Sequence, residues 1–292
     1  MISVEAVRKR YRPLVALDGV DFAVEAGEIV AVLGPNGAGK TTLIEIMEGF
    51  QRPDSGRVTV LGTDPYAEGP RLRERIGVML QECEPEPYLS VTELLELYRG
   101  YYRKPRPVAE LLDRVGLANK ADARIRTLSG GQCRRLDLAV ALVGNPELVF
   151  MDEPTTGFDP EARQAAWQVV KDLRDSGTTV VLTTHYLEEA EALADRVVVL
   201  AEGAVRAEGP PETIGSRNRA PTRVSFTPLE SVSHEELPVA ICVQDGRWVA
   251  ITDSPTATLA ILTSWAIERG VELESLSVTR PSLQDTYLEL IR

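Results

Sequence analysis

The stretch Gly34-Pro35-Asn36-Gly37-Ala38-Gly39-Lys40-Thr41-Thr42 decides the fold of this chain. It follows the apolar run Ile29–Leu33, which predicts a buried strand, and it leads into residues 42–47, which predict the start of a helix. Four residues separate Gly34 from the Gly-Lys-Thr ending, as the phosphate-binding loop pattern requires. The sequence therefore predicts a loop that binds nucleotide phosphates between a strand and a helix.

Each residue type in this loop suits that chemistry. Glycines let the backbone turn so that successive N–H groups face the phosphates, and the helix N-terminus adds partial positive charge. Lys40 would reach the β- and γ-phosphates, and the Thr41 hydroxyl would bind magnesium. A Gly-rich turn with an incidental lysine is the alternative, but the strand-to-helix setting favours nucleotide binding. The predicted nucleotide-binding residues are therefore Gly34, Pro35, Asn36, Gly37, Ala38, Gly39, Lys40, Thr41 and Thr42.

A second apolar run, residues 148–151, ends in the carboxylates Asp152 and Glu153. A parallel sheet presents residues at this position to a ligand at its carboxyl edge. A solvated acidic turn is the alternative, and the fully apolar run beside a phosphate-binding loop makes it the weaker one. Phosphoryl transfer needs positioned charge rather than covalent chemistry, so a few such groups suffice.

Other motifs surround this pair in a fixed order. They are Leu128-Ser129-Gly130-Gly131-Gln132, then Thr156-Gly157-Phe158-Asp159, then Thr183-Thr184-His185. With these motifs the chain resembles the ATP-binding subunit of an ABC transporter over about residues 1–215. The segment Glu153-Pro154-Thr155-Thr156-Gly157-Phe158-Asp159-Pro160 and the ending at residues 280–290 are similar to bacterial exporter ATPases of the daunorubicin-resistance type.

The resemblance implies an α/β fold of the P-loop NTPase class. We expect an ABC-type ATPase domain at residues 1–215, with a mixed sheet core and a helical insert at about residues 84–145. A small α+β domain would follow at residues 216–292. The pattern of strand, helix and strand after residue 130 independently indicates a parallel α/β core.

The resemblance also implies roles for single residues. Asp152 would hold magnesium through water, Gln81 would bind magnesium and sense the membrane partner, and Glu153 would polarise the attacking water. His185 would contact the γ-phosphate as the switch histidine. A lone surface glutamine or histidine is usually structural, but the motif order favours the functional interpretation for both. Tyr11 could stack on adenine, or it could be an ordinary core or surface tyrosine.

The signature Ser129-Gly130-Gly131-Gln132 predicts a second anion site, because it also begins a helix. In ABC ATPases the signature of one subunit completes the ATP site of the other, which implies a head-to-tail homodimer with Asp159 across the interface. Two residues depart from the family pattern: Cys133 stands where a basic residue is common, and Phe158 stands where leucine is usual. Neither removes a catalytic group. For Cys133 we expect a buried helix position rather than a redox role.

The composition limits the partners. The chain has 292 residues and a formal charge of -12, which argues against nucleic acid as the main partner. Three separated cysteines and two histidines indicate neither a disulfide framework nor a zinc site, which fits a reducing cytoplasm. Residues 1–5 lack the apolar core of a signal peptide, and no run of ~18 apolar residues could span a bilayer. A membrane part would therefore be another chain.

Residues 216–292 carry no second phosphate-binding loop or metal-ligand cluster. Residues 216–221 predict a polar connector, and residues 223–226, 239–243 and 248–251 predict strands. Ser254 and Pro255 predict the start of a helix to residue 267, and residues 271–278 and a closing helix complete the domain. This last helix would bury one face, within the domain or on a partner: Leu283, Tyr287, Leu290 and Ile291.

The sequence thus predicts a subunit that binds and hydrolyses ATP with Mg²⁺ and energises a separate permease for export of a drug-like or lipid-like molecule. It would lie at the cytoplasmic face of the membrane. The alternative is a soluble ABC ATPase that acts on ribosomes or DNA; a single cassette without sustained heptads disfavours it. A regulatory nucleotide binder without turnover is disfavoured by Glu153 and His185.

Overall fold

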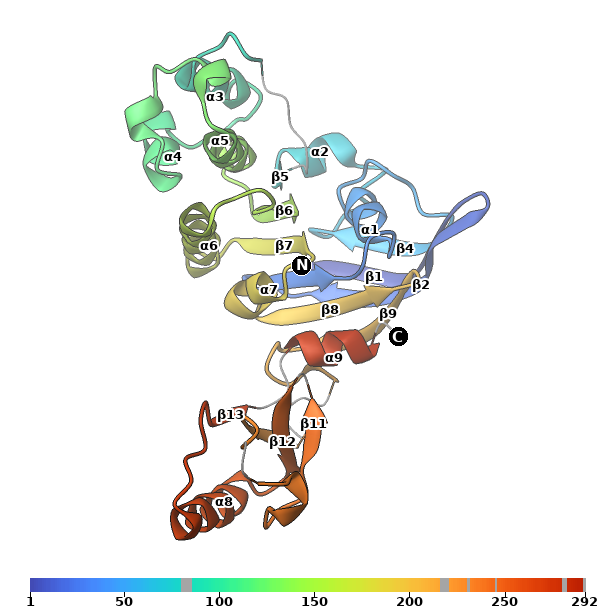
Figure 1. Ribbon diagram of the computed structural model, residues 1–292. Helices are drawn as coiled ribbons and strands as arrows, with labels where there is room; N and C mark the ends of the chain where they lie inside the picture. The colour runs from blue at the N-terminus through green and yellow to red at the C-terminus, as the bar shows by residue number, and fades with distance from the viewer. Residues whose placement is uncertain (80–85, 216–220, 230–231, 245, 280–282, 291–292) are drawn as a thin grey trace. The chain divides into compact units, whose positions relative to one another are not determined.

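The computed structural model describes residues 1–79, 86–215, 221–229, 232–244, 246–279 and 283–290 (Figure 1). The chain divides into two compact units, Met1–Pro211 and Glu212–Leu290. All nucleotide motifs of the sequence lie in the first unit.

The larger unit contains a six-stranded sheet in the order β5-β6-β7-β3-β8-β9. Neighbouring strands pair in parallel except β8 and β9, which pair antiparallel. The strands are β3 (Ile29–Leu33), β5 (Ile76–Met79), β6 (Leu148–Asp152), β7 (Thr179–Thr184), β8 (Arg196–Ala201) and β9 (Ala204–Gly209).

The central strands are continuous buried runs, as expected where both faces of a parallel sheet are covered. Their register determines where the motifs meet. Leu33 of β3 pairs with Thr184 of β7, and Asp152 of β6 pairs with Thr183 of β7. The phosphate-binding loop, the acidic pair and the histidine motif therefore leave the sheet at one edge.

A second, antiparallel sheet in the order β2-β1-β4 shares a hydrophobic core with the first sheet and with α1. Its strands are β1 (Ile2–Tyr11), β2 (Leu14–Val24) and β4 (Ser55–Val60). The tight connection between β1 and β2 brings Tyr11 beside Leu14.

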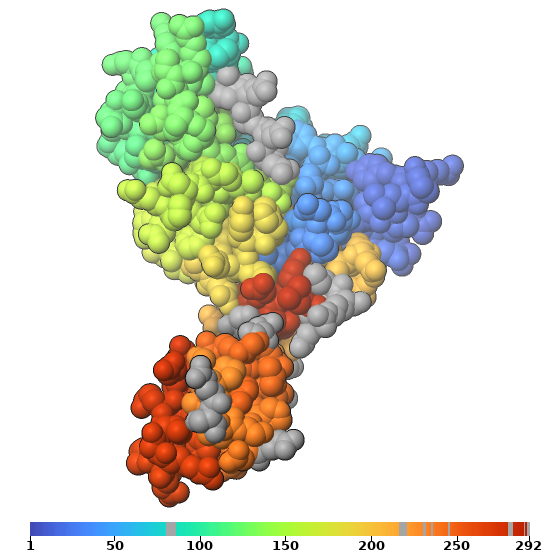
Figure 2. Space-filling model, viewed as in Figure 1, coloured from blue at the N-terminus to red at the C-terminus, as the bar shows by residue number. Residues whose placement is uncertain are grey.

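Between β5 and β6 lies a helical region that contains α3, α4 and α5, within the predicted insert (Figure 1). In Figure 2 it forms one continuous green lobe of the larger unit. A capping box starts α3: Ser90 Oγ accepts from the Glu93 N–H at 3.1 Å, and Glu93 Oε2 accepts from the Ser90 N–H at 2.7 Å. The helices of this unit are α1 (Lys40–Met47), α2 (Gly69–Arg73), α3 (Val91–Arg99), α4 (Val108–Arg114), α5 (Gly130–Leu142), α6 (Pro160–Asp175) and α7 (Leu187–Leu193), with short 3₁₀ turns η1 (Ala118–Lys120) and η2 (Ile125–Thr127).

The smaller unit contains a four-stranded antiparallel sheet in the order β11-β12-β10-β13, with α8 packed on its core face. Its strands are β10 (Thr222–Phe226), β11 (Cys242–Gln244), β12 (Arg247–Thr252) and β13 (Ser277–Thr279). The remaining elements are η4 (His234–Glu236), α8 (Pro255–Arg269) and α9 (Leu283–Leu290).

Several predicted elements of the smaller unit differ from the structure. The predicted strands 239–243 and 271–278 overlap only in part with β11 and β13. Val239, Ile241 and Val271 lie outside these strands and pack against the core from loops, which explains their apolar character. Helix α8 extends past residue 267, and Ser254 precedes it without a side-chain cap. Most of the predicted connector, and Ile291 of the predicted helix face, lie outside the described residues.

On that predicted face of α9, Leu283 is buried, and Tyr287 and Leu290 are half-buried. Thr286, which was not predicted on this face, is also buried. In the described ranges of both units, no helix is apolar enough over a sufficient length to cross a bilayer.

Candidate nucleotide-binding site

The phosphate-binding loop connects the end of β3 to the start of α1 and requires glycine at both ends. A Cβ on Gly34 would lie 2.3 Å from the carbonyl oxygen of Leu200. A Cβ on Gly39 would lie 2.3 Å from the carbonyl oxygen of Ala16, and Gly39 also has a left-handed φ of 101°. The loop therefore lies directly against neighbouring backbone, which only glycine permits.

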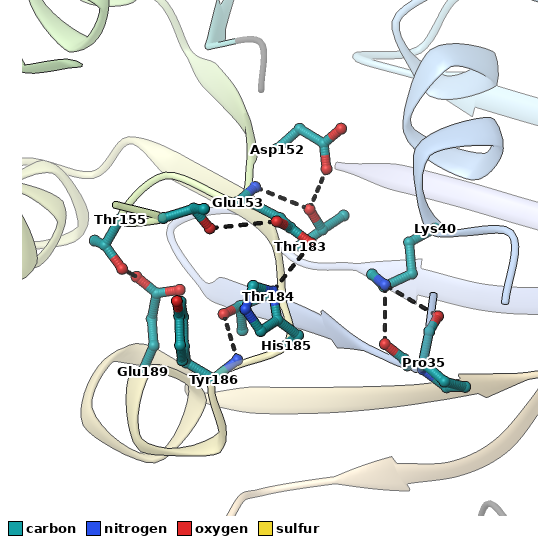
Figure 3. A network of polar contacts seen from close by, with 12 residues as sticks. Pro35, Lys40, Asp152, Glu153, Thr155, Thr183, Thr184, His185, Tyr186 and Glu189 are labelled. Carbon is teal, nitrogen blue, oxygen red and sulfur yellow. Dashed lines mark hydrogen bonds and ion pairs between the residues drawn. The ribbon is translucent and has the colours of Figure 1, made fainter. Parts of the chain in front are cut away.

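Lys40 is buried, with 7% of its surface exposed. Its Nζ donates to the carbonyl oxygens of Gly34 at 2.9 Å and Pro35 at 3.2 Å (Figure 3). Burial lowers the pKa of Lys40, and the nearby negative charges of Glu153 and Asp152 oppose that shift. A bound phosphate would add further negative charge beside this amine.

A cavity of about 360 Å³ opens beside this loop. Tyr11, which is 39% exposed, lies on its wall, with Lys9 Nζ 5.5 Å from the ring centroid. Leu14 and Ala16 were not predicted; their apolar positions across the turn from Tyr11 were the available signal. The lining residues are Tyr11, Leu14, Ala16, Asn36, Gly37, Gly39, Lys40, Thr41, Thr42 and Glu153.

Asp152 ends β6 beside the first turn of α1. Its Oδ2 accepts from the Thr41 hydroxyl at 3.2 Å, and its Oδ1 accepts a short hydrogen bond from the Thr183 hydroxyl. A carboxylate and a hydroxyl are oxygen ligands of the kind that Mg²⁺ prefers, with phosphates and water as the remaining ligands. Among the described residues there is no cluster of three or more His, Cys, Asp or Glu side chains that could hold a metal alone. The oxygen atoms of Thr41 and Asp152 suit Mg²⁺ that takes its other ligands from nucleotide phosphates and water.

Glu153 lies in a strained turn directly after β6, with a left-handed φ of 48°. Its N–H donates to the carbonyl oxygen of Thr183 at 3.2 Å and to the Thr183 hydroxyl at 3.1 Å. Its Oε1 lies 3.1 Å from His185 Nδ1, and its Oε2 accepts from the Thr156 hydroxyl at 3.2 Å (Figure 3). The structure thus brings the predicted residues Glu153 and His185 together.

A buried carboxylate supports the same turn from α7. Glu189 is fully buried, and its Oε1 accepts from the Thr155 hydroxyl at 2.8 Å and from Trp167 Nε1 at 3.1 Å. Figure 3 shows the contact between Thr155 and Glu189. Because Thr155 follows the acidic pair and Trp167 belongs to α6, Glu189 connects three segments around the site.

The signature begins α5 at Gly130, which confirms the predicted helix start. Ser129 Oγ accepts from the Gln132 N–H at 3.3 Å, and Gln132 Oε1 accepts from the Ser129 N–H at 3.0 Å. Asp159 caps α6 by accepting from the Ala162 N–H at 2.8 Å. Within the described part of the chain, neither the signature nor Asp159 lines the cavity at Lys40.

Three further predicted positions have simple outcomes. Gln81 lies outside the described residues. Cys133 is half-buried rather than buried, and burial together with the charge of Asp137 raises the pKa of its thiol. Phe158 is buried, as a core residue in place of leucine would be.

Two family models match the chain. The model described as ABC transporter matches residues 17–156, and the model for the C-terminal domain of ABC transporter domain-containing protein-like sequences matches residues 222–282.

Curated relatives match almost the whole length. The daunorubicin resistance ATP-binding protein DrrA3 of Streptomyces coeruleorubidus is 40% identical over 309 residues, which cover 99% of this chain and 95% of the relative. DrrA of Streptomyces peucetius, a daunorubicin/doxorubicin resistance ATP-binding protein, is 38% identical over 99% of this chain and 92% of the relative. The Nod factor export ATP-binding protein I of Burkholderia thailandensis is 42% identical over 73% of this chain and 72% of the relative.

Solved structures of ATP-binding cassettes are also similar to this chain. The dimeric post-hydrolysis ATP-binding cassette MJ0796 with ADP and Pi has a TM-score of 0.66 and 29% identity, and the match covers 72% of this chain and 98% of that chain. An ATP-binding subunit of an ABC transporter has a TM-score of 0.67 and 27% identity over 73% of this chain and 90% of that chain. The chain therefore belongs to the ABC-transporter family, as an ATP-binding subunit with ATPase activity.

Proposed function

We propose that this chain hydrolyses Mg²⁺-bound ATP at a site shared between two copies of itself and thereby powers export through a separate permease. The observation that carries this proposal is the meeting of Lys40, Asp152, Glu153 and His185 at one edge of the central sheet.

Residues 34–42 bind the phosphates, with Lys40 as the main positive charge and the loop N–H groups as donors. The cavity beside them holds the nucleoside, and the exposed ring of Tyr11 stacks on adenine. Leu14 supplies apolar surface at the same wall.

Thr41, Asp152 and Gln81 hold the magnesium ion. When bound, Mg²⁺ neutralises phosphate charge and fixes the phosphate orientation. Asp152 is prepared for this role because Thr183 holds its second carboxylate oxygen.

Glu153 polarises the attacking water, and His185 orients the Glu153 carboxylate and contacts the γ-phosphate. Two hydroxyl groups support this arrangement: Thr156 donates to the carboxylate, and Thr183 accepts from the backbone N–H. The protein thus contributes a fixed, charged setting, which is what phosphoryl transfer requires.

The residues Ser129, Gly130, Gly131 and Gln132 complete the ATP site of a second copy, with Asp159 at the interface between copies. The support is that Ser129 and Gly130 are exposed at the start of α5 and that none of the four residues lines the described cavity at Lys40 in its own chain. The MJ0796 cassette, which is described as dimeric, has the same fold. We therefore propose a head-to-tail homodimer.

The transport role rests on the relatives named for drug resistance and for Nod factor export. We propose that the cargo is drug-like or lipid-like and that a membrane permease on another chain carries it. The ATPase then lies at the cytoplasmic face of the membrane, with residues 1–215 as the nucleotide domain and residues 216–292 as an accessory domain.

A vesicle experiment tests the proposal. The chain is co-expressed with a candidate permease, and uptake of daunorubicin is measured in inverted vesicles with ATP and Mg²⁺. We expect uptake that the Glu153→Gln variant abolishes. ATP hydrolysis that continues in the Glu153→Gln variant would contradict the assigned chemistry, and hydrolysis without any effect on uptake would contradict the export role.

A further inference from the structure

Arg134 is a buried arginine on the signature helix α5, with 8% of its surface exposed. Its guanidinium donates to three successive backbone carbonyls: Nη2 to Asp152 at 3.0 Å and to Glu153 at 3.0 Å, and Nε to Pro154 at 3.3 Å. One side chain of α5 therefore holds the backbone of the whole catalytic turn.

Burying the positive charge of Arg134 costs free energy, which points to a function for this contact. A buried charge needs hydrogen bonds and a counter-charge, and here Asp137 Oδ2 lies 3.9 Å from Arg134 Nη1 on the same helix. The planar fork of arginine can serve several carbonyl oxygens at once, which a lysine ammonium does with poorer geometry.

The turn that Arg134 holds is the strained one. Glu153 has a left-handed φ of 48°, a conformation that a side-chain-bearing residue keeps only when its surroundings enforce it. Thr183 fixes the N–H of Glu153, and Arg134 fixes its carbonyl oxygen. The two contacts come from different segments, so the position of the catalytic carboxylate depends on the position of α5.

We propose that Arg134 is a positioning residue that connects the two ATP sites of the dimer. This inference rests on the proposed composite site. The N-terminus of α5, with Ser129, contacts the nucleotide of the partner's site, while Arg134 on the same helix holds Glu153 of its own site. Binding of ATP at one signature thereby sets the geometry of the glutamate in the other site.

The first test uses the full chain with Arg134→Met, which removes the donors and keeps an unbranched stem. We expect kcat to fall at least ~10-fold while the Kd for ATP stays within ~2-fold, since a small displacement of a catalytic group lowers rate more than affinity. Arg134→Lys should give an intermediate kcat. If Arg134→Met lowers the far-ultraviolet circular dichroism signal, Arg134→Lys carries the test.

Arg135 provides the matched control. It is the next residue on α5, and its Nη1 donates to the carbonyl oxygens of Val115 at 3.5 Å and Gly116 at 3.3 Å, away from the catalytic turn. Arg135→Lys should keep kcat within ~2-fold of wild type. An equal loss of kcat in Arg134→Met and Arg135→Lys would overturn the positioning role. A loss of ATP affinity in parallel with kcat in Arg134→Met would overturn it as well.

A mixed-dimer test separates the two sites. In the first arm, the Arg134→Met chain is mixed with a large excess of Glu153→Gln chain, so that the active site has the altered arginine in its own chain. In the second arm, wild-type chain is mixed with an excess of the double variant Arg134→Met, Glu153→Gln. The active site then has an intact arginine and glutamate in its own chain, and the partner supplies it with an altered signature helix. The reference is wild-type chain with excess Glu153→Gln.

We expect the rate of ATP hydrolysis in both arms to be at least ~10-fold below that of the reference mixture. A loss confined to either arm would overturn the claim that Arg134 connects the sites. Different measurements would reveal a failure of the proposed function. In that case Glu153→Gln alone would retain hydrolysis, or the reference mixture would show no activity above that of the Glu153→Gln chain.

Discussion

His185 Nδ1 lies 3.1 Å from Oε1 of Glu153, and this contact joins the ends of β7 and β6. The Glu153 side chain is only 12% exposed, whereas the His185 side chain is 40% exposed. The histidine therefore holds the carboxylate with one nitrogen and keeps an accessible face for a ligand.

His185→Ala should lower kcat by roughly 10²-fold and leave ATP affinity nearly unchanged, because the glutamate loses its orienting partner and not its charge. Phosphate release measures kcat, and a fluorescent nucleotide titration measures affinity. His234→Ala is the matched control, since His234 is the other histidine of the chain and belongs to the smaller unit. Equal losses in the two variants would contradict the assignment.

Lys40 and Glu153 should separate ATP binding from turnover. Lys40→Ala removes the positive charge in the loop, so it should weaken ATP binding at least ~10-fold and abolish hydrolysis. Glu153→Gln should keep ATP binding and stabilise an ATP-dependent dimer, because only the action on water is lost. Size-exclusion chromatography with and without ATP measures the dimer. A Lys40→Ala chain that binds ATP like wild type would exclude the assigned role of the lysine.

Much of this site is predictable from the sequence, because its strands are short buried runs and its motifs follow directly. The predicted strand Ile29–Leu33 matches β3 residue for residue. The contacts of Glu153 with Thr183 and of Arg134 with the same turn were not predicted, because they join residues that are distant in sequence. The only signals were a hydroxyl inside an apolar strand and a charge on the buried face of α5. In the smaller unit, the apolar Val239 fits a strand pattern in the sequence, but it packs against the core outside β11. An apolar pattern indicates burial and does not specify a hydrogen-bonded neighbouring strand.

Two inactive variants should complement each other if catalysis is shared between copies. A Lys40→Ala chain keeps an intact signature, and a Ser129→Arg chain keeps an intact phosphate-binding loop. Their mixture should regain one competent site per heterodimer, which gives at most about half of the wild-type activity per dimer, and less because ATP at one site sets the geometry of the other. The hydrolysis rate of the mixture measures this. Activity no higher than that of either variant alone would contradict the composite site.

Glu48 should make stability fall with rising pH. It follows α1, is 2% exposed, and its pKa is raised to about 8 by burial, with further contributions from Asp152 and Glu45. Between its ordinary pKa and about 8, the folded state binds a proton that the unfolded state has released. The free energy of unfolding therefore decreases as pH rises through this window.

Glu48→Gln should remove this loss, because glutamine stays neutral. The variant should be more stable than wild type by roughly 2–4 kcal/mol at or above pH 8, with little difference near pH 5. Urea unfolding across this pH range measures the free energy. Glu25→Gln, at an exposed position, is the control and should leave the pH dependence as it is. A wild-type chain equally stable across the window would show that Glu48 ionises normally.

Removal of the smaller unit should leave the nucleotide site intact. That unit has its own hydrophobic core, formed by β10, β12 and α8, and none of the residues lining the Lys40 cavity belongs to it in the described chain. A chain that ends at residue 215 should therefore bind ATP within ~2-fold of the full chain. We expect instead a smaller dimer population in the Glu153→Gln background, or weaker export, because a domain without chemistry acts through contacts. If the truncated chain is folded by circular dichroism but does not bind ATP, the nucleotide domain extends beyond residue 215.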